Sequence, residues 1–128
     1  MHEHFRYFEV GPDPFGRKWT AQFRWLQTAI SIRHADTVDV KFLLKCDDGT
    51  EEEKVVALPH AALLEVCKEH NRKLTDPWCM KLAALHVRRM IETAEDIEKN
   101  LVTLTASEIA DLDRELQGEL EPNLLAKR

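Results

Sequence analysis

Apolar and polar residues alternate along the first half of the chain, which is the pattern of β-strands with one buried face. The clearest strand covers residues 37 to 46, where every second side chain from Val38 to Cys46 is apolar. The dipeptide Asp48-Gly49 that follows is typical of a tight hairpin turn. Residues 51 to 58 are therefore expected to return as the next strand of an antiparallel pair.

Two earlier segments also predict strands. Residues 5 to 10 are rich in aromatic side chains and end at a turn segment that contains two prolines and two glycines. In residues 18 to 34, alternation places Trp19, Phe23 and Trp25 on one side and then resumes one position out of phase. Such a phase change is what a β-bulge or a bend in a long strand produces.

The second half of the chain changes to helical spacing. Pro59 can begin a helix over residues 59 to 70, because the first turn needs no N–H donor at that position. Asp76 followed by Pro77 predicts the N-cap and the first residue of a second helix. The apolar stripe that follows extends this helix to about residue 100.

A capping box predicts a third helix, because Thr105 is followed three residues later by Glu108. This helix should end near Gly118 and is acidic, whereas the second helix carries Arg88 and Arg89. Opposite charges on the two helices could pair within one chain or between chains. The acidic residues of this segment are Glu108, Asp111, Asp113, Glu115, Glu119 and Glu121.

Strands followed by helices predict an α+β fold, and 128 residues suit a single domain, residues 1-128. Residues 5-58 are the β-sheet half, residues 59-120 the helical half and residues 121-128 a frayed tail. We expect a four-stranded, mostly antiparallel sheet covered on one face by about three C-terminal helices.

The composition is that of an ordinary globular protein, 44% hydrophobic and 32% charged. A net charge of −5 disfavours unspecific binding to nucleic acid. No apolar stretch approaches the roughly 20 residues of a membrane span, and the first residues lack a secretory signal pattern. The three cysteines fit reduced thiols better than a disulfide framework. We therefore expect a cytoplasmic protein that does not bind membranes.

The second helix favours a protein–protein interface. If it runs to residue 100 it is about 36 Å long, which is more than one small sheet needs for cover. Part of its apolar stripe should then pack against a partner, most simply a second copy in a homodimer. The residues divided between core and interface are Trp78, Leu82, Leu85, Met90, Ile91 and Ile97.

A second hypothesis is binding of single-stranded nucleic acid, because basic and aromatic side chains interleave along one predicted strand. Alternation also predicts the aromatic residues simply as the core face of the sheet. Solvent exposure of Trp19, Phe23 and Trp25 separates the two interpretations. The residues of the nucleic-acid hypothesis are Arg17, Lys18, Trp19, Phe23, Arg24, Trp25 and Arg33.

Catalytic chemistry has little support in the sequence. No nucleophile elbow, phosphate-binding loop or zinc-protease motif is present. Cys67 with His70, and His34 with Asp36, are the local pairs that a third hypothesis, an enzyme, could use. A metal would need Cys67 and His70 to meet a third ligand, drawn from His60, Cys79 and His86. We expect no metal or cofactor, and favour a non-enzymatic interaction or assembly module that binds itself or another protein.

Overall fold

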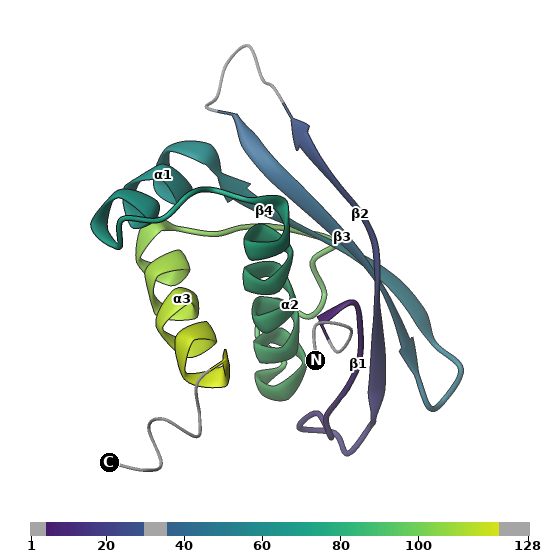
Figure 1. Cartoon of the computed structure of the whole chain (residues 1–128). Coiled ribbons are helices and arrows are strands. Elements are labelled where there is room, and N and C mark those ends of the chain that lie inside the picture. Colours follow the sequence, from purple (N-terminus) through teal and green to yellow (C-terminus); the bar gives the residue numbers. More distant parts are fainter. Residues whose placement is uncertain (1–4, 30–35, 121–128) are drawn as a thin grey trace, which may run out of the picture.

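A five-stranded sheet forms one layer of the computed structural model, which describes residues 5–29 and 36–120 (Figure 1). Its first four strands form an antiparallel meander in chain order. The α+β class and the expected strands are confirmed, and the end of the strand expected over residues 18 to 34 lies outside the described residues. The strands of the meander are β1 (Tyr7–Val10), β2 (Trp19–Ala29), β3 (Thr37–Cys46) and β4 (Glu51–Pro59).

A fifth strand, β5 (Leu101–Thr103), was not expected and pairs parallel with β4. The prediction of a helix as far as residue 100 is wrong, because α2 (Asp76–Thr93) ends at Ala94, which has a left-handed φ of 60°. The buried Lys54 ammonium donates hydrogen bonds to the carbonyls of Ile97 and Lys99. These bonds hold the segment against β4 instead of in a helix.

The β-bulge in β2 is confirmed, but it lies one residue earlier than the alternation indicated. Phe23 pairs with Phe42 and Trp25 with Lys41, so Arg24 is the extra residue. Phe42 is buried under the helices whereas Lys41 points to the other face. Trp25 therefore lies on the opposite face of the sheet from Phe23, and the expectation that they share a face is wrong.

Three helices cover one face of the sheet: α1 (His60–Glu69), α2 and α3 (Ala106–Leu120) (Figure 1). The N-cap of α2 is Thr75, whose hydroxyl accepts from the Trp78 amide at 3.3 Å, and not Asp76. The capping box of α3 is confirmed by reciprocal bonds between Thr105 and Glu108 at 2.9 and 3.1 Å. An ion pair of 3.3 Å between Arg89 and Glu115 joins α2 to α3 within the chain.

The core lies between the helices and the inner face of the sheet. It contains the inward side chains of β1 to β5 and the facing sides of all three helices. None of the helices in the described part of the chain is both long and apolar enough to cross a membrane. The predicted frayed tail lies outside the described residues.

Candidate interaction surface

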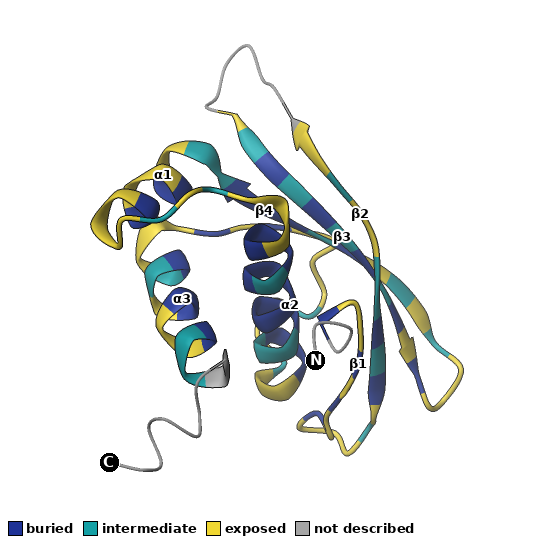
Figure 2. Cartoon of the chain, viewed as in Figure 1, coloured by how far each residue is buried: buried dark blue, intermediate teal, exposed yellow. Residues whose placement is uncertain are grey.

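No helix of residues 5–29 and 36–120 lies on the outer face of the sheet, and the outward positions there are half-buried or exposed at most places (Figure 2). Along β3 buried residues alternate with outward residues that are half-buried or, at Lys45, exposed. One face of the sheet is thus packed against the helices, and the described residues leave the other face to solvent, as antiparallel sheets commonly do.

Apolar side chains gather on this face at the level where Trp25, Lys41, Val55 and Leu101 stand in one row across four strands. Trp25 is 37% exposed and Leu101 59% exposed, although both belong to residue types that usually pack inside. We define the outer patch as the large apolar side chains of this row and of the neighbouring outward row, which runs from Tyr7 on β1 through Leu43 on β3. The outer patch contains Tyr7, Trp25, Leu43, Val55 and Leu101.

Lys41 stands in the middle of the outer patch with its charge already matched. Its ammonium lies 5.6 Å from the centre of the Trp25 ring and 2.8 Å from a Glu53 carboxylate oxygen. The aliphatic stem can then add apolar surface while the charged end is paired. A second pair, Lys45 with Glu51 at 3.8 Å, stands farther along the same two strands.

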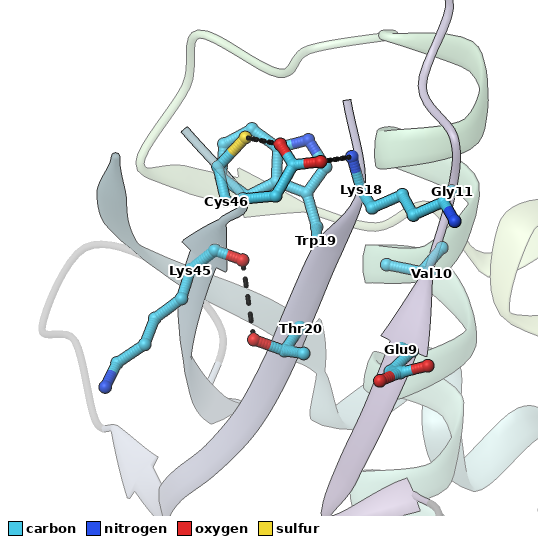
Figure 3. A pocket seen from close by; sticks show the side chains of 9 residues that line it. Glu9, Val10, Gly11, Lys18, Trp19, Thr20, Lys45 and Cys46 are labelled. Atoms are coloured by element: carbon cyan, nitrogen blue, oxygen red, sulfur yellow. Dashed lines mark hydrogen bonds between the residues drawn. The ribbon is translucent and has the colours of Figure 1, made fainter. Parts of the chain in front are cut away.

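Two hollows open on the outer face. The larger, of about 580 Å³, lies where β1 and β3 end and β2 begins, over the row Glu9, Thr20 and Lys45 (Figure 3). The smaller, of about 380 Å³, lies at the free edge of β4 beside Lys41 and Val55. Each is lined by charges of both signs, which suits protein contacts better than one strongly charged ligand.

The cysteine that lines the larger hollow is not activated. Cys46 is almost fully buried, and burial raises the pKa of its thiol above the ordinary value. A protonated thiol is a poor nucleophile at neutral pH. The larger hollow therefore has no reactive thiolate.

The predicted interface residues of the second helix lie in the core of a single chain. Trp78, Leu82, Leu85, Met90 and Ile91 are buried, and Ile97 is half-buried against the same core. Packing within the chain therefore accounts for the apolar stripe. None of the large hydrophobic side chains that the described chain exposes belongs to α2.

The aromatic residues of the predicted nucleic-acid strand separate. Trp19 is 1% exposed, Phe23 is half-buried under the Arg6 guanidinium, and only Trp25 reaches the surface. Solvent exposure was the criterion that separates a stacking platform from a core face, and Trp25 alone meets it.

The basic residues of that hypothesis also fail to form one surface. Arg17 forms an ion pair with Asp13 at 3.0 Å, while Lys18 and Arg24 are exposed. Arg33 lies outside the described residues. The cation that lies against Trp25 is Lys41, at 5.6 Å from the ring centre, and its charge is paired with Glu53 at 2.8 Å.

Asp13 anchors the loop between β1 and β2, a role that sequence reasoning missed. Burial alone would raise its pKa, but hydrogen bonds from the Trp19 indole, the Arg17 backbone and side chain and the Phe15 amide lower the pKa to about 2. The carboxylate thereby fixes Trp19 in the core. Asp13 followed by Pro14 is a turn signal that could have indicated such a bond to the backbone.

The pair Cys67 and His70 meets an acid in the structure, because His70 Nε2 lies 3.7 Å from Asp113 Oδ2. Asp113 is fully buried and its other oxygen accepts from Arg72 and from the Trp78 indole, at 2.8 and 3.0 Å. Burial raises the pKa of the Cys67 thiol, which is 4% exposed. This cluster therefore joins α1, α2 and α3 and lacks an accessible thiolate.

The remaining candidates for catalysis or metal binding are dispersed. The Asp36 backbone carbonyl accepts from the His60 amide at 2.8 Å, and His34 lies outside the described residues. Cys79 and His86 are core residues of α2, and burial raises the pKa of the Cys79 thiol to about 12. No group of three or more metal-ligating side chains comes together in residues 5–29 and 36–120.

In comparison with known proteins, no family model, no curated protein and no solved structure matches this chain. The function must therefore be inferred from the geometry of the chain itself.

Sequence reasoning missed four of the five residues of the outer patch: Tyr7, Leu43, Val55 and Leu101. One signal was present, because Leu43 is apolar at a position where the alternation of residues 37 to 46 calls for a polar side chain. An apolar residue on the wet side of an otherwise regular strand indicates a contact that alternation alone does not explain.

Proposed function

We propose that this chain is a non-enzymatic assembly module that associates with itself through the outer patch. The observation that carries the proposal is the row across β2 to β5 whose two ends, Trp25 and Leu101, are exposed large apolar side chains, on a sheet face that no described element covers. Large apolar side chains grouped on one surface mark interaction sites in soluble proteins.

The surroundings of the outer patch support this reading. Aromatic side chains are enriched in interface cores, and here Trp25 and Tyr7 supply them. The pair of Lys45 with Glu51 stands farther along the same strands, beside the apolar side chains, as in the polar rim of an interface. Two sheets can also pack face to face at about 10 Å with their strands aligned, which is a stable arrangement for uncovered faces.

The test compares two leucine substitutions of equal chemistry. Leu101→Arg places a charge in the outer patch, whereas Leu64→Arg places the same charge on α1, where Leu64 is 48% exposed. Sedimentation equilibrium of the wild type over a wide concentration range should give a reversible dimer. Leu101→Arg should weaken the dimer at least about tenfold, because a buried unpaired charge opposes association.

Leu64→Arg is the control and should dimerise as the wild type does. A wild-type protein that stays monomeric at every concentration would overturn the proposal. So would equal dimer affinities for Leu101→Arg and Leu64→Arg, because the outer patch would then play no part in association.

A further inference from the structure

We infer that the second copy is placed by a two-fold axis that runs parallel to the strands, between β3 and β4, so that each β3 faces the β4 of its partner. This inference rests on the self-association proposed above.

The charge pattern of the outer face is the first reason. The outward side chains along one half of β3 include Lys41 and Lys45, and those along the adjoining half of β4 are Glu51 and Glu53. We call these two pairs the lysine column and the glutamate column. A two-fold axis parallel to the strands lays each lysine column over a glutamate column.

The other aligned arrangement has a two-fold axis across the strands. It would lay β3 over β3 and β4 over β4, bringing lysines over lysines and glutamates over glutamates. Like charges opposed across an interface suppress association. The columns therefore favour the axis parallel to the strands and disfavour the axis across them.

The row of the outer patch gives a second and independent reason. In this row Trp25 on β2 and Leu101 on β5 stand at equal distances on either side of the β3–β4 boundary. Rotation about an axis at that boundary carries β2 over the β5 of the partner. The two exposed ends of the row then meet, the indole against the leucine side chain, twice in each dimer.

Cross-linking at the neighbouring row tests the arrangement without touching the outer patch. Gln27 on β2 and Thr103 on β5 are exposed and occupy one row, through Asp39 and Ala57. Within a chain they are three strands apart, about 14 Å, whereas in the inferred dimer each lies over the other at about 10 Å. A short thiol-specific bifunctional reagent can span the second distance only.

The double variant Gln27→Cys with Thr103→Cys should give a covalent dimer in good yield. Each single variant should give little more than the wild type, whose three native thiols are buried. Efficient cross-linking of Gln27→Cys alone would overturn the inferred axis. So would a double variant that remains a dimer in solution but does not cross-link.

Charge reversal supplies a second readout. The variant Lys41→Glu with Lys45→Glu should dimerise at least about tenfold more weakly than the wild type, since glutamates then face glutamates across the interface as well as Glu51 and Glu53 within the chain. Adding Glu51→Lys and Glu53→Lys to the same chain exchanges the two columns and should restore the affinity. A quadruple variant that dimerises as weakly as the double variant would contradict the inference.

The two proposals fail in different ways. If the wild type is monomeric, self-association and the inferred arrangement both fall. If Leu101→Arg weakens the dimer but neither cross-linking nor column exchange behaves as expected, the outer patch remains the interface and only the axis is wrong.

Discussion

Replacing Asp113 by alanine should destabilise the fold far more than any other acidic substitution on α3. Asp113 Oδ1 accepts from both Arg72 and the Trp78 indole, so one buried carboxylate oxygen ties α3 to α2 and to the segment before it. In Asp113→Ala the indole of Trp78, which is 7% exposed, loses its acceptor. A buried donor without a partner costs about 1–3 kcal/mol.

Arg72 contributes less, because its side chain is 28% exposed and can turn to solvent. We therefore expect Asp113→Ala to lower the free energy of unfolding by about 3 kcal/mol. The unfolding entropy of 128 residues is about 0.27 kcal/mol per kelvin, which converts this loss to a fall in Tm of about 11 °C.

Two variants calibrate the measurement by thermal and urea unfolding. Asp111→Ala, two residues away, removes only an exposed pair with Arg114 and should cost less than about 0.5 kcal/mol. Asp113→Asn keeps an acceptor oxygen for both donors and should cost about 1 kcal/mol. If Asp113→Ala is no less stable than Asp111→Ala, the cluster does not hold the helices together and the reasoning is refuted.

Two further substitutions probe buried polar side chains. Burial lowers the pKa of His86 below its ordinary value of 6.5. Its contribution to the free energy of unfolding is therefore present above that pH and is lost as the pH falls. His86→Leu should therefore lose less stability than the wild type between about pH 7 and pH 5, and an equal loss would contradict this. Lys54→Met should cost about 2 kcal/mol by removing the bonds to Ile97 and Lys99. Hydrogen exchange should then quicken at the Val55 and Leu104 amides, which bond β5 and its flanks, more than in the β2–β3 pair.

The regular elements could be predicted because local patterns decide them. Residues 37 to 46 alternate with Leu43 as the one large apolar side chain on the outward side, and the strand has those bounds. The capping box at Thr105 likewise uses only residues that are neighbours in sequence. In both places the local preference and the tertiary fold agree.

The errors arose where a distant residue decides the structure. β5 has three residues, too few for periodicity, and Lys54 on another strand holds the segment before it. The alternation fits a bulge at Arg24 and a bulge one residue later almost equally well. The position of the bulge nevertheless decides which face of the sheet carries Trp25. Asp113 belonged by pattern to an acidic helix surface, and only the fold brings Arg72 and Trp78 to it.

The parallel pairing of β5 with β4 also sets the order in which the outer surface can be completed. Val55 on β4 and its neighbour Leu101 on β5 are separated in the sequence by α1 and α2, so they can pair only after both helices have packed across the sheet. Pairings of such long sequence separation form late in folding. A chain that assembles through this row would then be recruited only once its own fold is finished, so that assembly itself selects mature molecules.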